Sequence, residues 1–199
     1  MTTQLFNGRQ TLLGALVAAL AAVCFAALAG SDPKGAEAGG RACAHANATP
    51  QDVGVRKLRR AVGCLINSER VSRDRRRVRL NDDLARVATR HTKVMVRTDC
   101  LKHQCPGERP LKTRIERSGY LKPGNRYGYG EILGCSQTPA SIVQGWMARR
   151  YDRRNILDRR FRHFGIGAKQ GSPFPRSSKS CSPGRKHVTY TVLFGWRRR

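Results

Sequence analysis

Residues 161–168 read FRHFGIGA and residues 187–196 read HVTYTVLFGW, and these two stretches decide the fold class. Apolar side chains alternate with polar or small ones in both, which is typical of strands that bury one face. Between them, residues 171–186 form a loop of Gly, Ser, Pro and basic residues. The chain is therefore expected to end in a hairpin-like pair of strands.

The segments upstream have the apolar spacing of amphipathic helices. Thr49 and Pro50 supply an N-cap and a first-turn proline, so a first helix is expected to begin at Thr49. Its apolar stripe consists of Leu58, Val62, Leu65 and Ile66. A second helix is expected to run from Asn81, as its cap, to about Arg97.

Two further helices complete the predicted elements. A short one over residues 110–119 ends at a glycine, and another opens at Thr138-Pro139. His91 lies on the inner face of the second helix, and we interpret it as a hydrogen-bonded core residue rather than a catalytic one. Helices that precede strands, with no internal repeat, indicate an α+β fold rather than alternating α/β.

Residues 1–29 have the parts of a secretory signal peptide. Arg9 is the one charged residue before the apolar run LLGALVAALAAVCFAAL at residues 12–28, and Ala27-Leu28-Ala29 fits a cleavage site. We expect cleavage after Ala29 and secretion. The alternative is an uncleaved N-terminal membrane anchor, for which the apolar run is short. Residues 30–48 then form a leader, and residues 49–199 form one domain.

Cysteine usage agrees with export. Of the seven cysteines, Cys24 lies in the signal peptide, which leaves Cys43, Cys64, Cys100, Cys105, Cys135 and Cys181. An even number in an exported chain predicts three disulfides, and the sequence alone does not choose among the 15 pairings. A Cys43–Cys64 bridge would attach the leader to the first helix. A structural zinc site is not expected, because it requires closely spaced cysteine pairs.

The charge of the chain points to anionic partners. There are 39 Lys and Arg against 13 Asp and Glu, a net charge of +26, with arginine runs at residues 73–79, 149–162 and 197–199. Such a surface attracts polyanions: an anionic cell-wall polymer, an anionic lipid surface, or nucleic acid held through its phosphates without base readout. The alternative is a solvated surface whose arginine content reflects composition alone. No dedicated protein partner follows from the sequence.

A set of short segments, in order between residues 50 and 196, resembles the CAP superfamily. This superfamily comprises the cysteine-rich secretory proteins, antigen 5 and the pathogenesis-related proteins, and its domain is also called the SCP domain. The resemblance is closest to the bacterial secreted branch. It rests on residues 64–70 (CLINSER), 84–95, 102–103, 114–115, 118–120, 129–131, 146–147, 154–157, 164–167 and 190–195.

The resemblance implies an α–β–α sandwich with a small antiparallel sheet flanked by helices. It also implies a cleft in which two His and two acidic residues can hold a divalent metal, and His103 and Glu131 match two of these positions. Three positions depart from the family pattern. Asp152 stands where the second His belongs, Ile132 replaces the Asn of the Gly-Glu-Asn segment, and Val192 replaces a Gln of the last strand.

These departures change the expected chemistry of the cleft. His103, Glu131 and Asp152 could form a site for a divalent metal, zinc or calcium, with one imidazole and two carboxylates, a set that is less selective for zinc. However, four arginines surround Asp152 in the sequence, so a salt-bridged carboxylate in a structural polar cluster is expected instead. No Gly-x-Ser-x-Gly elbow occurs, and oxidised cysteines are not nucleophiles.

The sequence therefore predicts a secreted CAP/SCP-domain protein that binds at the cell envelope or outside the cell, through a strongly basic surface, without enzymatic activity. The alternative is a metal-dependent hydrolase that uses the His103, Glu131 and Asp152 cleft.

Overall fold

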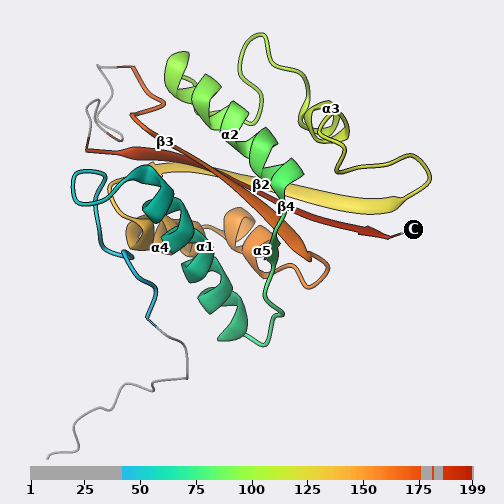
Figure 1. The fold of residues 1–199 in the computed structure, drawn as a ribbon, viewed down its shortest axis with the longest axis horizontal. Helices are drawn as coiled ribbons and strands as arrows, with labels where there is room; N and C mark the ends of the chain where they lie inside the picture. The colour runs from blue at the N-terminus through green and yellow to red at the C-terminus, as the bar shows by residue number, and fades with distance from the viewer. Residues whose placement is uncertain (1–41, 176–180, 182–185, 199) are drawn as a thin grey trace, which may run out of the picture. The chain divides into compact units, whose positions relative to one another are not determined.

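A four-stranded sheet in the order β1-β3-β4-β2 forms the middle of the fold (Figure 1). In the computed structural model, residues 42–175, 181 and 186–198 are described, all within the unit Ala38–Arg199. The strands are β1 (Arg79–Leu80), β2 (Arg126–Ser136), β3 (His163–Gln170) and β4 (Val188–Arg198). The predicted signal peptide, the leader up to residue 41, parts of the loop at 171–186 and Arg199 lie outside the described residues.

The expected pair of C-terminal strands is confirmed, because β3 pairs antiparallel with β4 over the full length of β3. β2 pairs antiparallel with the other side of β4 and becomes an edge strand. The small antiparallel sheet that the resemblance implies is confirmed in β2, β3 and β4, and the two-residue β1 adds a parallel pair with β3. β2 was not expected as a strand: its glycines and tyrosines do not give a simple apolar alternation.

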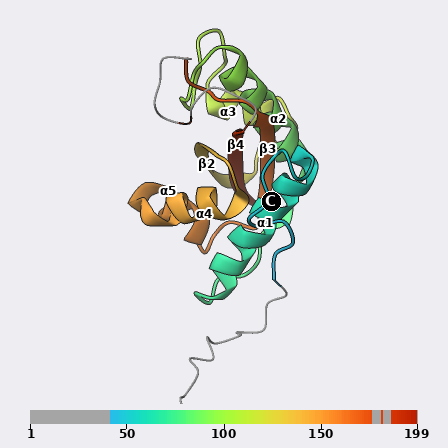
Figure 2. The ribbon, with the colours of Figure 1, turned by 90° about the vertical axis from the view of Figure 1, so that its left-hand side faces the viewer.

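Helices cover both faces of this sheet (Figures 1 and 2). α1 (Val55–Val71), α4 (Pro139–Ala148) and α5 (Arg150–Leu157) bury one apolar cluster against one face. α2 (Asp82–Arg97) and α3 (Leu111–Glu116) bury a second cluster against the other face. The arrangement is the predicted α–β–α sandwich of an α+β protein.

The structure confirms two of the predicted N-cap residues and contradicts a third. Asn81 accepts a hydrogen bond from the Leu84 N–H and Thr138 accepts one from the Ser141 N–H, so the starts of α2 and α4 are confirmed. The expected helix start at Thr49 is wrong. Thr49 instead binds the Asp52 carboxylate through its backbone N–H and its hydroxyl, both at 2.8 Å, which closes a local turn before α1.

Two glycines let α2 lie directly on β3. A Cβ at Gly165 would come within 2.2 Å of the Ala85 nitrogen, and a Cβ at Gly167 within 2.3 Å of the Ala88 oxygen. No other residue type allows this approach, because every other side chain begins with that atom. The close contact fixes the height of α2 above the sheet and, with it, the position of His91.

Three disulfides staple the described residues, as the cysteine count predicts. Cys43 pairs with Cys64 and attaches the segment before α1 to that helix. Cys100 pairs with Cys105 in the loop after α2, and Cys135 of β2 pairs with Cys181. Within the same residues, no helix has both the length and the apolar character needed to cross a membrane.

Candidate functional site

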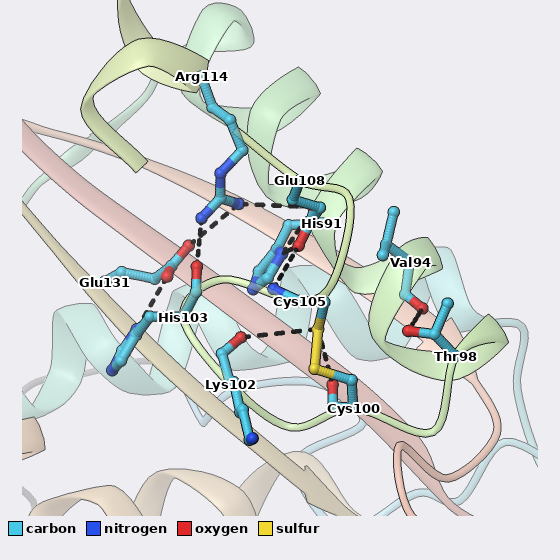
Figure 3. Close-up of a disulfide and its surroundings, with 10 residues drawn as sticks. All are labelled: His91, Val94, Thr98, Cys100, Lys102, His103, Cys105, Glu108, Arg114 and Glu131. Carbon is cyan, nitrogen blue, oxygen red and sulfur yellow. Dashed lines mark hydrogen bonds and ion pairs between the residues drawn. A yellow bond between two sulfur atoms is a disulfide. The ribbon is translucent and has the colours of Figure 1, made fainter. Parts of the chain in front are cut away.

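His103 and Glu131 form a hydrogen-bonded pair at the β2 edge of the sheet (Figure 3). His103 lies in the loop that the Cys100–Cys105 disulfide closes, and its Nδ1 is 2.8 Å from Oε1 of Glu131. The two side chains differ greatly in exposure: 66% of the imidazole is accessible, against 1% of the carboxylate. The pair is therefore a buried acid that orients a largely exposed imidazole.

The pair shifts the protonation of the imidazole. The hydrogen bond to Glu131 raises the pKa of His103 above its ordinary value, and this effect outweighs the partial burial of the ring, which acts in the opposite direction. Because Nδ1 is used by Glu131, Nε2 is the nitrogen left to face a ligand or solvent. The imidazole projects away from the other side chains of the site (Figure 3).

Behind this pair, Arg114 lies between two carboxylates. Its Nη1 is 3.8 Å from Glu131 Oε2 and 3.9 Å from Glu108 Oε1, and its Nη2 donates a hydrogen bond to the carbonyl of His103. Arg114 and Glu108 are only 11% and 10% exposed. A nearly buried guanidinium thus supplies positive charge behind the His103–Glu131 pair and holds the His103 loop in place.

The polar network continues to α2. Nδ1 of the fully buried His91 is 2.8 Å from Glu108 Oε2, and that same oxygen accepts a hydrogen bond from the Cys105 N–H. The interpretation of His91 as a hydrogen-bonded core residue is confirmed. His91 connects the rigid face of α2 to the loop that carries His103.

Asp152 lies in the first turn of α5 and binds an arginine. Arg149 Nε is 2.6 Å from Asp152 Oδ2, the salt bridge that the neighbouring arginines led us to expect. Burial nevertheless raises the pKa of Asp152, because loss of solvent outweighs the attraction of Arg149. The carboxylate is close enough to His103 for each group to shift the pKa of the other.

As arranged, these residues do not fit a divalent metal. A metal site needs several lone pairs directed at one point. Here His103 has only Nε2 free, because Nδ1 is bonded to Glu131. The second oxygen of Glu131 faces Arg114, and Asp152 is paired with Arg149. Among the described residues, no group of three or more His, Cys, Asp or Glu side chains is placed to hold an ion.

The two other departures from the CAP pattern lie outside the cleft. Ile132 and Val192 are both fully buried in the cluster beneath α1 and α4. Glu131 points to the opposite face of β2, because neighbouring residues of a strand alternate between faces. Their replacement of amide side chains is therefore a change of the core and does not remove a group from the His103 side.

Sequence reasoning missed two members of the site, Glu108 and Arg114. Glu108 lies in the loop before α3, where no helical or strand period indicates which side chains turn inward, and Arg114 lies in α3, whose six residues are too few to show one. Arg114 did belong to a family-like segment, which was the one available signal. Glu108 had none, because its partners are set by the loop that the Cys100–Cys105 disulfide closes.

Comparison with solved structures identifies the same architecture in three bacterial proteins. An extracellular protein with an SCP domain from Bacillus anthracis is 19% identical, with a TM-score of 0.53 over 71% of this chain and 43% of its own. An outer surface protein from Borrelia burgdorferi is 14% identical, with a TM-score of 0.59 over 73% of this chain and 97% of its own. A cysteine-rich secretory protein from Staphylococcus aureus is 12% identical, with a TM-score of 0.50 over 71% and 38%.

This chain thus spans less than half the length of the Bacillus and Staphylococcus proteins and nearly all of the Borrelia protein. No curated protein sequence matches it. The sequence model of the cysteine-rich secretory protein family matches residues 65–191, which include α2, the His103 loop, Glu131 and most of the sheet. The chain belongs to the cysteine-rich secretory protein family, the CAP family.

Proposed function

We propose that the protein is exported and binds at the cell envelope, where its basic surface holds an anionic polymer. The observation that carries the proposal is that the carboxylates of the site are paired within the protein, whereas most arginines of the basic runs are exposed to solvent. The carboxylates of the site, Glu108, Glu131 and Asp152, are engaged by neighbouring His or Arg side chains. The arginines of residues 73–79 and 149–162 are mostly exposed, so the surface charge is left for external anions.

Export is supported by two features of the chain. The three disulfides require an oxidising compartment to form and persist. The predicted signal peptide at residues 1–29 supplies the route to that compartment. The related Bacillus and Borrelia proteins are described as extracellular and outer surface proteins, which agrees with this location.

The His103 site favours binding over hydrolysis. A histidine–acid pair acts in catalysis when it activates a nucleophile, which must lie within hydrogen-bond reach of the free imidazole nitrogen. In the described part of the chain, no Ser or Thr hydroxyl bonds His103, and the cysteines outside the signal peptide are in disulfides. Metal-dependent hydrolysis, the alternative, would require Glu131 and Asp152 to leave their arginine partners.

The proposal is tested by co-sedimentation of the protein, expressed from the full chain, with purified bacterial cell walls. The expected result is pelleting at low salt and release at high salt, because screening weakens contacts between exposed charges. Walls from which the phosphate-containing polymers have been extracted should pellet much less protein. Failure to pellet with intact walls at low salt would overturn the proposal.

A further inference from the structure

We propose that a pocket lined by six arginines and Trp196, at the carboxyl end of β4, is the specific binding site for a phosphodiester-linked envelope polymer. The pocket has a volume of about 430 Å³, within the range of small-ligand sites, about 300–1,000 Å³. This inference rests on the proposed function and adds to it a defined site and ligand chemistry. The residues that line the pocket are Arg126, Arg159, Arg160, Arg162, Trp196, Arg197 and Arg198.

Three segments far apart in the sequence meet at this end of the sheet. They are the start of β2, the loop between α5 and β3, and the end of β4, all of which lie toward the C-terminus in Figure 1. The sheet register aligns two of them, since Arg126 of β2 is directly opposite Arg198 of β4. The backbone N–H of Arg162 donates to the carbonyl of Gly195, which ties the loop to β4.

Two of the arginines, Arg162 and Arg197, are held in place by contacts with the rest of the fold. The Arg162 guanidinium donates hydrogen bonds to the carbonyls of Arg159, Arg160 and Phe161, so it organises the loop from inside. Arg197 donates to the Tyr120 carbonyl at 2.6 Å and lies 4.8 Å from the centre of the Tyr120 ring. A fixed guanidinium loses little entropy when it binds an anion.

Arg160 is the one pocket arginine that forms an ion pair among the described residues, with Asp158 at 2.7 Å. The six lining arginines and Asp158 together give this end of the sheet a net charge of +5. Arg126 and Arg198 face each other directly across the strands, an arrangement that destabilises a sheet when both residues carry the same charge. An anion bound between them would relieve this repulsion.

Trp196 gives the pocket an aromatic wall. Its indole lies over Gly128, where a Cβ would come within 2.4 Å of the indole nitrogen, so the missing side chain of Gly128 makes room for the ring. The six arginines could hold several charged groups, while the indole offers a flat apolar surface to the organic unit that links them. An inorganic anion has no carbon atoms that could contact that surface.

The pocket is separate from the His103 site. Arg126 and Glu131 are an odd number of residues apart on β2, so their side chains point to opposite faces of the sheet. They also lie about 16 Å apart along the strand at about 3.3 Å per residue. Substitutions in the pocket therefore leave the polar network around Arg114 intact.

The charge favours a polyanion over a single small anion. Arginine binds phosphate and carboxylate oxygens alike through two parallel hydrogen bonds, and a chain of phosphodiesters brings one charge per repeat into the pocket. A single carboxylate would neutralise one of the five charges. A polyol chain linked by phosphodiesters supplies both the repeated anions and a carbon linker whose C–H groups can contact the indole.

The experiment is a titration with a synthetic poly(glycerol phosphate) of defined length, followed by tryptophan fluorescence. The chain has two tryptophans, and Trp146 is fully buried in the core, so a signal lost in Trp196→Phe reports on the pocket. Arg126→Gln/Arg198→Gln should weaken binding about tenfold or more, because two charged contacts are lost. The matched control is Arg56→Gln/Arg60→Gln, which removes equal charge from exposed positions of α1.

If both pairs of substitutions weaken binding equally, or if binding gives no Trp196 response, the pocket is not the binding site. Neither result would contradict the proposal that the protein binds cell walls. Two competitors test the ligand class: poly-glutamate of the same charge, and oligo(dT). Equal affinity for poly-glutamate would overturn the phosphate assignment, and tighter binding of oligo(dT) would assign the pocket to nucleic acid instead. Failure of the unmodified protein to pellet with walls would reject the proposed function itself.

Discussion

Ile132 on β2 and Val192 on β4 lie directly opposite each other, and both side chains are completely buried. The resemblance to the CAP family implies amide side chains at these two positions, where this chain carries an apolar cross-strand pair. The two apolar residues are compatible with each other. An amide at either position would face an apolar side chain across the strands and would find no hydrogen-bond partner there.

This pairing predicts non-additive mutational effects. Ile132→Asn and Val192→Gln should each lower the free energy of unfolding by about 2–5 kcal/mol, since each buries an unpaired amide in the core. The double variant should recover about 1 kcal/mol of the summed loss, because the two amides can bond each other. Urea denaturation of the four proteins measures this coupling. If the losses of unfolding free energy in the two single variants simply add in the double variant, the two positions do not compensate for each other.

The His103–Glu131 pair predicts a pH dependence with a definite sign. The raised pKa of His103 means that the folded state binds the proton more tightly than the unfolded chain does. The stability from the pair is therefore complete below the unfolded pKa, about 6.5, and is lost as the pH rises through the folded pKa. NMR titration of the imidazole should give a pKa above 6.5 that falls in Glu131→Gln; an unchanged value in that variant would refute the assigned cause.

The disulfides should differ in their contribution to stability. Cys135–Cys181 closes a loop of 46 residues, Cys43–Cys64 one of 21 and Cys100–Cys105 one of 5. Loop-closure entropy gives contributions of about 4, 3 and 2 kcal/mol in that order. Replacing each pair with alanine and measuring unfolding in urea tests the ranking. The largest loss in Cys100→Ala/Cys105→Ala would contradict it.

The glycine contacts between α2 and β3 predict a strong local effect. Gly167→Ala should cost about 1–3 kcal/mol, since its Cβ would press on the Ala88 carbonyl at 2.3 Å. Gly145→Ala is the control, because nothing lies within 4 Å of a Cβ there and alanine is the better helix former, by about 0.8–1 kcal/mol. The midpoint temperature of thermal unfolding should therefore fall in Gly167→Ala and rise in Gly145→Ala.

The sequence predicted the elements whose signals are local. The caps Asn81 and Thr138 and the alternation in β3 and β4 depend on a few neighbouring residues, and the structure confirms them. Thr49 misled because its turn with Asp52 uses the same side-chain chemistry as a helix cap. β2 escaped prediction because Gly128 and Gly130 leave room for Trp196 and Asn155, residues distant in the sequence.

The candidate site could be predicted only in part from the sequence. His103, Glu131 and Asp152 were found through family-like segments, and the structure brings them into mutual electrostatic contact. Arg114, in the six-residue helix α3, and Glu108, in the loop before it, could not be assigned, since neither segment shows a repeating pattern. The arginine pocket was visible as charge runs, but only the sheet register brings Arg126 beside Arg198.

The most direct measurement compares two variants of the full chain on the same purified walls at low and high salt. One carries His103→Gln and Glu131→Gln in the His103 site, and the other carries Arg126→Gln and Arg198→Gln in the pocket; circular dichroism confirms that both are folded. We expect the His103-site variant to pellet like the unmodified protein and the pocket variant to pellet much less. A folded His103-site variant that remains in the supernatant would contradict binding through the pocket and assign it to the His103 site.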